Sequence, residues 1–248
     1  MDKSSRLDIP IEEQRHAWNR WNESTREVKL GRVSELQSAA ILRWMTALAR
    51  ADLRIIDVGC GTGWMSERLA PFGHVTATDL ADEVLQRARV RAPHVEFISG
   101  DFMQLPFERD SFDVAVSLEV LSHVADQPAF IRRIADLLKP GGHLMLATQN
   151  RYVLERWSEI PPSTPGYIRH WVSARTLRRL LRPHFEIVEL TSVMPVGDQG
   201  PLRLVNSVKL NSIAALMASR EKLDHLKEKL LLGHTLLALA RKRANALH

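Results

Sequence analysis

The sequence predicts an α/β fold: a doubly wound, mostly parallel sheet of seven strands, with helices on both faces and an antiparallel last strand. Two observations predict it. Short apolar segments alternate with amphipathic helical segments, and a glycine-rich turn lies directly between the first strand and the next helix. Strands separated by helices pair in parallel through right-handed connections. A ligand site is then expected at the carboxyl ends of the strands.

The amino-terminal half gives the clearest pattern. Two helices, at residues 11–29 and 34–50, precede the first strand, because apolar residues such as Leu36 and Trp44 recur there at helical spacing. Strands are then expected at residues 54–58, 74–78, 95–98, 112–117 and 142–147. The helices between them are expected at residues 64–70, 81–89 and 129–138.

The carboxyl-terminal half is less regular. Residues 150–170 contain three prolines and indicate an irregular insertion, after which Ser173 caps a helix at 174–181 that leads into a strand at 185–192. A loop at 195–201 and a basic amphipathic helix at 206–232 follow, and the last strand is expected at 234–242.

This pattern divides the chain into four parts. They are amino-terminal helices that form a lid or cap (1–50), a core (51–194), a helical insertion (195–233) and the last strand with a tail (234–248).

Composition indicates one sizeable globular domain or a domain with an insertion. The chain has 248 residues, of which 45% are hydrophobic and 25% charged. The single cysteine, Cys60, cannot form an internal disulfide, and residues 1–15 lack the apolar stretch of a signal peptide. The longest apolar run, residues 230–240, is shorter than the ~20 residues that span a bilayer. We therefore expect a cytoplasmic protein.

The net charge of +5 is uneven, because residues 151–248 carry +8 and residues 1–150 carry −3. Such a basic part can attract an anionic substrate, a nucleic acid or an acidic membrane surface, although charges along helices are more often a solvated face. No basic stripe interleaved with stacking aromatic residues is evident, which disfavours nucleic acid as a partner.

The segment from Asp57 to Gly63 reads D-V-G-C-G-T-G and joins a strand to a helix. Glycines are needed where a backbone turns sharply and approaches a ligand closely. A dinucleotide fingerprint would need glycine at the position of Trp64, and a phosphate-binding loop would need a lysine that the segment lacks.

At these residues the chain resembles the class I, Rossmann-like S-adenosylmethionine-dependent methyltransferases, whose loop reads D/E-x-G-x-G-x-G. The resemblance runs over residues 54–148, and more faintly to 192. It implies S-adenosylmethionine as cofactor. Asp79 would accept hydrogen bonds from the ribose hydroxyls, and Asp101 and Phe102 would contact the adenine. The cofactor-binding residues that it implies are Asp57, Gly59, Cys60, Gly61, Gly63, Asp79, Leu80, Asp101, Phe102 and Ser117.

The segment at residues 117–124 is similar to that of the small-molecule and quinone-type branch of this family, and it contains His123, the first candidate for a catalytic base. The second candidate is His170, at the end of the insertion. Either histidine could instead only pack or cap a helix. The chain has no Asn/Asp-Pro-Pro-aromatic tetrad after the fourth strand, which disfavours methylation of nucleobase amino groups.

Trp18, Asn150 and Tyr152 are the candidates for substrate contact, because they stand in the least regular parts of the chain. The alternative for Trp18 is a role as a core anchor of its helix. We find no cluster of residues with metal-ligand spacing and expect no metal.

The sequence therefore predicts an enzyme that transfers a methyl group from S-adenosylmethionine to a hydroxyl or an amine of a small-molecule acceptor. Two alternatives stay open. One is a peripheral membrane enzyme that methylates a quinone or lipid precursor and uses helix 206–232 as its interfacial face. The other is a protein that binds the cofactor without turnover.

Overall fold

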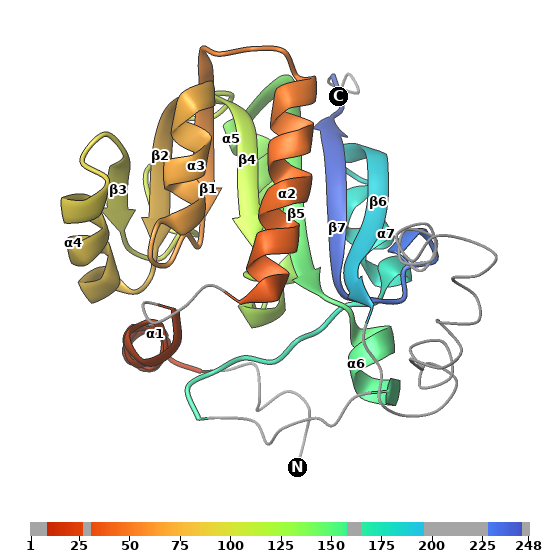
Figure 1. The fold of residues 1–248 in the computed structure, drawn as a ribbon, viewed down its shortest axis with the longest axis horizontal. Helices are drawn as coiled ribbons and strands as arrows, with labels where there is room; N and C mark the ends of the chain where they lie inside the picture. The colour runs from red at the N-terminus through yellow and green to blue at the C-terminus, as the bar shows by residue number, and fades with distance from the viewer. Residues whose placement is uncertain (1–8, 27–30, 158–164, 196–227, 245–248) are drawn as a thin grey trace, which may run out of the picture.

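The computed structural model describes residues 9–26, 31–157, 165–195 and 228–244. Seven strands form one sheet in the order β3-β2-β1-β4-β5-β7-β6 (Figure 1). The strands are β1 Leu53–Val58, β2 Gly73–Asp79, β3 Glu96–Ser99, β4 Phe112–Leu118, β5 Leu138–Gln149, β6 Phe185–Pro195 and β7 Gly233–Lys242. Pairs among β1 to β5 are parallel, and β7 is antiparallel to both of its neighbours. The predicted fold class is confirmed.

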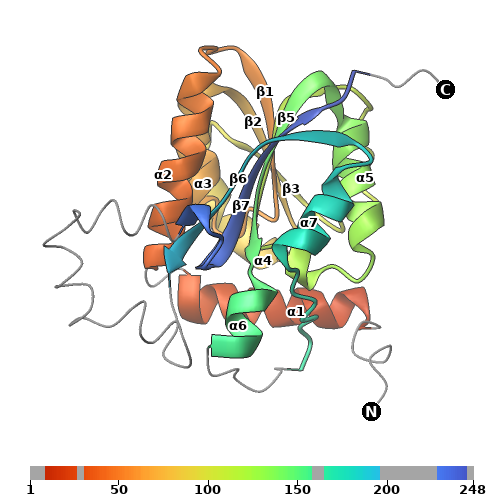
Figure 2. The ribbon, with the colours of Figure 1, turned by 90° about the vertical axis from the view of Figure 1, so that its right-hand side faces the viewer.

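Helices cover both faces of the sheet (Figure 2). They are α1 Ile11–Trp21, α2 Arg32–Ala47, α3 Trp64–Leu69, α4 Asp82–Arg91, α5 Gln127–Leu137, α6 Arg151–Trp157 and α7 Ala174–Leu181. Helices α2 and α3 lie on one face, and α5 and α7 lie on the other. Helix α1 crosses the end of the sheet at which the parallel strands finish.

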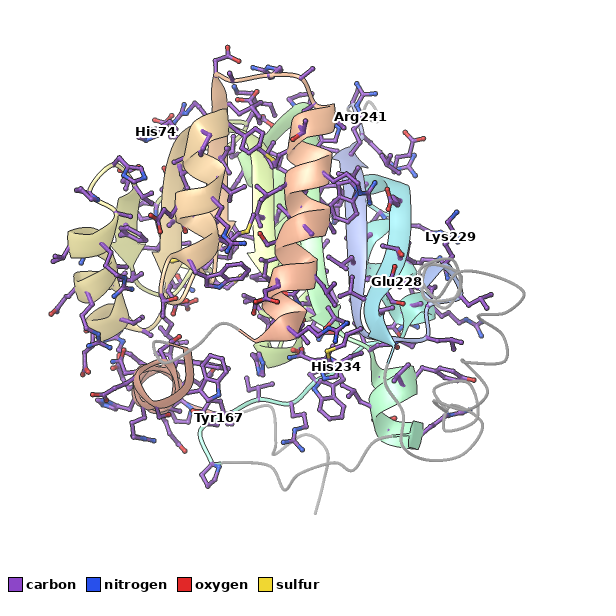
Figure 3. The ribbon with its side chains drawn as sticks, viewed as in Figure 1. His74, Tyr167, Glu228, Lys229, His234 and Arg241 are labelled. Carbon is purple, nitrogen blue, oxygen red and sulfur yellow. The ribbon has the colours of Figure 1, made fainter. Side chains whose placement is uncertain are left out.

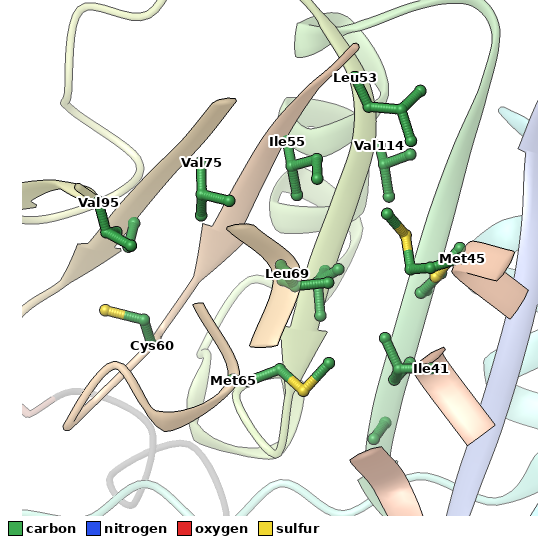
Figure 4. Packing of buried hydrophobic residues seen from close by; sticks show 14 of the residues in the cluster. Ile41, Met45, Leu53, Ile55, Cys60, Met65, Leu69, Val75, Val95 and Val114 are labelled. Carbon is green, nitrogen blue, oxygen red and sulfur yellow. The ribbon is translucent and has the colours of Figure 1, made fainter. Parts of the chain in front are cut away.

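Each face of the sheet buries its own core. Ile41 and Met45 of α2 pack with Met65 and Leu69 of α3 against the inner strands, and Figure 4 shows this cluster. On the other face, residues of α5 and α7, including Phe130 and Leu177, pack on β4, β5 and β7. Burial of apolar side chains on both faces explains why the parallel strands read as nearly continuous apolar runs.

Two helix starts follow directly from the sequence. The Asp126 side chain accepts a hydrogen bond from the Ala129 nitrogen at the start of α5, at 2.9 Å. The Ser173 side chain accepts one from the Thr176 nitrogen at the start of α7, at 3.2 Å, so the predicted cap is confirmed. Such caps satisfy nitrogens that have no partner within the helix.

The structure corrects several predicted bounds. Residues 150–170 are not wholly irregular, because α6 forms within them and buries Val153 and Leu154. The first helix ends at Trp21 rather than 29, and one π-turn, Asn22–Arg26, follows it. Strand β5 begins four residues earlier than expected, at Leu138, and β6 runs three residues further, to Pro195.

Of the loop expected at residues 195–201, the structure describes only residue 195. Of the helix expected at residues 206–232, it describes only residues 228–232. Within the described part of the chain, no helix is both long enough and apolar enough to cross a bilayer.

Candidate functional site

A glycine loop joins β1 to α3 and packs against the end of β2. The backbone nitrogens of Gly59 and Cys60 both donate to the Thr78 carbonyl, at 2.7 and 3.1 Å. Gly59 and Gly61 have φ angles of 74° and 53°, in the left-handed region that favours glycine. A Cβ on Gly59 would lie 2.2 Å from Cγ2 of Val120. Glycine at this position therefore allows the loop to approach the segment after β4.

Asp79, at the end of β2, holds this loop in place. Its Oδ2 accepts a hydrogen bond from the Gly61 nitrogen at 2.7 Å, and its Oδ1 accepts one from the Ala81 nitrogen at 2.8 Å. Burial raises the pKa of Asp79, and these backbone donors oppose the rise. The carboxyl group is thus a fixed acceptor at the cavity.

Asp57 lies at the same end of the sheet, near the end of β1. Its carboxyl group is buried and accepts a hydrogen bond from Oγ of Ser66 at 2.6 Å. Burial raises the pKa of Asp57 to about 7, the Ser66 hydrogen bond lowers it, and the nearby charge of Asp79 raises it further. Asp57 is therefore an anchor between β1 and α3 whose charge changes near neutral pH.

The segment after β3 adds a third acidic residue. Oδ1 of Asp101 accepts a hydrogen bond from the Met103 nitrogen at 3.0 Å. The neighbouring Phe102 packs edge-on against Phe130, with ring centroids 5.5 Å apart. The aspartate side chain and the phenylalanine ring are therefore both fixed in place at this end of the sheet.

These residues surround a cavity of about 710 Å³, within the range of ~300–1,000 Å³ typical of ligand pockets. Figure 3 shows Tyr167 and His234, two of its lining residues, at the end of the sheet near α1 and α6, far from His74 and Arg241. Eight of the ten residues predicted to bind cofactor line the cavity: Asp57, Gly59, Cys60, Gly61, Asp79, Leu80, Asp101 and Phe102.

The other two have different surroundings. Gly63 begins α3 with φ of 74°, and a Cβ there would lie 2.8 Å from the Phe97 ring, so this glycine permits helix packing. Ser117 is buried within β4, and its Oγ has no hydrogen-bond partner among the described residues. Neither of them lines the cavity.

Aromatic rings form one wall of the cavity. Trp18 of α1 makes edge-on contacts with Tyr167, His123 and Trp21, at centroid distances of 4.8, 4.7 and 5.6 Å. The Tyr167 hydroxyl donates to the Ala17 carbonyl at 2.6 Å and ties α1 to this wall. Trp18, a candidate for substrate contact, is therefore placed at the cavity.

His123 also lines the cavity. Its Nδ1 lies 2.8 Å from the Ile168 carbonyl, and because a carbonyl only accepts, Nδ1 carries the proton. Burial lowers the pKa of His123 to about 4. The hydrogen bond to Ile168 raises this pKa, and the charge of Arg169 lowers it further. The side chain is therefore neutral at pH 7, with Nε2 as its acceptor nitrogen.

The remaining candidates do not line the cavity. The His170 backbone nitrogen donates to Ser122, and its Nδ1 is buried without a partner among the described residues. The Asn150 side chain is buried and donates to the carbonyls of Leu231 and Gly233, both at 2.9 Å. Asn150 therefore joins the end of β5 to the start of β7.

Tyr152 is also outside the cavity. It is 43% exposed and lies under the guanidinium of Arg156, at 4.7 Å from its ring centroid. Tyr152 therefore lies on the surface of α6, and neither Tyr152 nor Asn150 lines the cavity.

Sequence reasoning missed many other lining residues, among them Gln37, Glu119, Tyr167 and His234. A signal existed for Glu119, because it directly follows β4 and the ends of parallel strands meet at one edge. Gln37 and His234 gave no such signal, since they reach the cavity from α2 and β7 only through tertiary packing. Within the described residues, no group of three or more His, Cys, Asp or Glu side chains could hold a metal ion.

The fold and cavity define a Rossmann-like α/β protein with a ligand site at the carboxyl ends of its parallel strands. Residues 56–146 match the family described as "Methyltransferase domain". They form a methyltransferase domain of the S-adenosylmethionine-dependent class.

Individual relatives agree with this assignment. Over 112 residues the chain is 44% identical to a ubiquinone biosynthesis O-methyltransferase of Xanthomonas euvesicatoria pv. vesicatoria, covering 43% of this chain and 47% of the relative. Over 118 residues it is 36% identical to a malonyl-(acyl-carrier protein) O-methyltransferase of Erwinia pyrifoliae, covering 46% and 45%. The matched part therefore spans about half the length of these curated relatives.

A solved structure extends the likeness to most of the fold. The S-adenosylmethionine-dependent methyltransferase from Mesorhizobium loti is 25% identical, with a TM-score of 0.57 over 80% of this chain and 96% of its own.

Proposed function

We propose that this chain is an S-adenosylmethionine-dependent methyltransferase that methylates a hydroxyl, or an amine, of a small molecule. One observation carries the proposal: a single cavity brings together the glycine loop, the acidic residues that end successive strands, and an aromatic wall. The methyltransferase domain at residues 56–146 supports it.

The lining residues fit this cofactor. Asp79 offers two fixed carboxylate oxygens to ribose hydroxyls, and Asp101 with Phe102 would hold the adenine. The loop at Gly59 to Gly61 lines the cavity and would lie against the methionyl end. When bound, the cofactor supplies a methyl group activated by a positively charged sulfur. The protein then contributes by positioning the nucleophile, which is worth up to ~7–11 kcal/mol.

His123 is the residue that we propose to orient the nucleophile. With its proton on Nδ1, the acceptor nitrogen Nε2 can receive a hydrogen bond from a hydroxyl in the cavity and take up the proton that this hydroxyl loses when it accepts the methyl group. Its lowered pKa keeps the ring neutral, so the ring does not repel a positively charged cofactor. His170 does not line the cavity, and we assign it no part in the reaction.

We propose a planar, phenol-type acceptor. Trp18, Trp21 and Tyr167 give the cavity an aromatic wall next to His123, which suits a flat ring that carries a hydroxyl. The ubiquinone biosynthesis O-methyltransferases among the relatives support this class of acceptor. We also propose that α1 and the start of α2 cap the cavity, because residues of both helices line it.

The test is methyl transfer from S-adenosylmethionine with an isotope-labelled methyl group to a panel of catechols, other phenols and amines. We expect label in a phenolic ether and one S-adenosylhomocysteine per methyl transferred. His123→Ala should lower kcat about 100-fold, within the ~10²–10⁴-fold typical of acid–base groups, with cofactor affinity nearly unchanged. Tight cofactor binding without transfer to any acceptor would instead identify a non-catalytic binding protein.

A further inference from the structure

Three elements bring polar side chains together beside the cavity. Gln37 comes from α2, Glu119 follows β4, and Thr235 belongs to β7. Oε1 of Glu119 accepts hydrogen bonds from Nε2 of Gln37 and from Oγ1 of Thr235, the latter at 2.9 Å. Gln37 and Glu119 both line the cavity. These contacts hold the glutamate side chain in one orientation.

The backbone of Glu119 is unusual. Its φ angle is 63°, in the left-handed region that residues with a Cβ seldom adopt, and its nitrogen donates to the Ala147 carbonyl at 2.9 Å. Strained residues of this kind concentrate at ligand sites, where the surrounding structure enforces them. The fold therefore holds the Glu119 side chain in place at the cost of a strained backbone.

The hydrogen bond to Glu119 also fixes the orientation of the Gln37 amide. A carboxylate only accepts, so the amide nitrogen must face Glu119 and the amide oxygen must point elsewhere. That oxygen is buried and accepts no hydrogen bond from any described residue, and Gln37 as a whole is 0% exposed. Buried acceptors are normally satisfied, so this oxygen requires a donor that a ligand could bring.

The charges that surround the cavity favour a cation. Five carboxyl groups and one guanidinium, that of Arg169, line it among the described residues. The two lining histidines add no positive charge near neutral pH, because burial lowers the pKa of both His123 and His234. The carboxyl groups belong to Asp57, Asp79, Asp101, Glu119 and Asp126.

Glu119 also lies next to the glycine loop. The residue after it, Val120, is the one whose Cγ2 would meet a Cβ on Gly59 at 2.2 Å. Under the proposed function, on which this step rests, that loop faces the methionyl end of the cofactor, which carries a primary ammonium group. We propose that the carboxylate of Glu119 and the amide oxygen of Gln37 bind this ammonium group. An ammonium has three N–H donors and can satisfy both acceptors at once.

Two ligands separate this role from others. S-adenosylhomocysteine carries the ammonium, whereas 5′-methylthioadenosine keeps the adenosine and the thioether but lacks the amino acid. Measured by calorimetry, Glu119→Gln should lower the affinity for S-adenosylhomocysteine about 10- to 100-fold, as expected for the loss of a charge-assisted hydrogen bond. Affinity for 5′-methylthioadenosine should stay within about twofold, since it makes no contact there.

Control variants show whether the change is specific. Glu119→Gln keeps an oxygen that can accept from Gln37 and Thr235, and a thermal melt checks that it folds. Gln37→Met removes the amide oxygen and should lower the affinity for S-adenosylhomocysteine about fivefold, with the affinity for 5′-methylthioadenosine unchanged. Asp136→Asn removes a carboxylate that pairs with Arg109 and does not line the cavity, so this variant should bind both ligands like the wild type.

Two results would overturn the inference. The first is Glu119→Gln protein that binds S-adenosylhomocysteine as tightly as the wild type does. The second is an equal loss for both ligands, which would make Glu119 a structural residue of the cavity. Wild-type protein that binds neither ligand would refute the proposed function itself, and this inference with it.

Discussion

Gly59 shows how a missing side chain shapes the site. Its left-handed φ of 74°, and the 2.2 Å that would separate a Cβ here from Val120, leave no room for any other residue. The role of this glycine was predictable from its place between a strand and a helix. The role of Gly63 was not, because the Phe97 ring that excludes a Cβ there comes from β3 and only the folded structure brings it near.

Gly59→Ala should lower the free energy of unfolding by about 3 kcal/mol, from backbone strain and overpacking together. Chemical denaturation measures this loss. Gly31→Ala is the matched control, because Gly31 has a negative φ and a Cβ added there would meet no atom within 4 Å. Equal stability of the two variants would show that the loop is not as tightly packed as described.

His123 should make stability depend on pH. The folded pKa is about 4, whereas an unfolded histidine titrates near ~6.5. Between these values the unfolded chain binds a proton that the folded chain does not, so stability falls as pH falls from about 6.5 to 4. Relative to His123→Gln, the wild type should lose about 3 kcal/mol over this window in urea titrations. Parallel pH profiles of the two proteins would contradict the buried, neutral state of His123.

At the scale of elements, short-range patterns predicted the five parallel strands and the cap at Ser173. They failed for α6, because a seven-residue helix has little intrinsic stability and depends on burying Val153 and Leu154. Short-range patterns also did not predict the hydrogen bonds of Asn150, which was expected to contact the substrate. Its bonds to Leu231 and Gly233 connect residues more than 80 positions apart, so the local sequence does not indicate them.

Asn150→Ala should therefore affect stability rather than cofactor binding. It leaves the buried carbonyl of Gly233 without its Asn150 donor, and we expect a loss of about 2 kcal/mol in the free energy of unfolding. Tyr152→Ala, on the exposed side of α6, should change stability by less than about 0.5 kcal/mol. An Asn150→Ala protein as stable as the wild type would remove the proposed link between β5 and β7.

At the scale of the whole molecule, alternation of strands and helices predicted the layers of the fold and the edge at which the cavity lies. It did not predict that β7 inserts between β5 and β6, because strand order depends on pairing between distant segments. Ala238 and its neighbours are buried in β7, which fits an interior strand with partners on both sides. The cap that we propose for α1 and the start of α2 likewise depends on packing across the chain, and the contact between Trp18 of α1 and His123 is one example of it.

We propose that the glycine loop and Asp79 together hold the cofactor. Calorimetric titration of wild-type protein and Asp79→Asn with S-adenosylhomocysteine tests it most directly, with a thermal melt to confirm that the variant folds. We expect one site per chain in the wild type and an affinity at least about tenfold lower in Asp79→Asn, as charge-assisted bonds to the ribose weaken. Wild-type protein that does not bind S-adenosylhomocysteine but does bind a pyridine dinucleotide would contradict this assignment of the cofactor site.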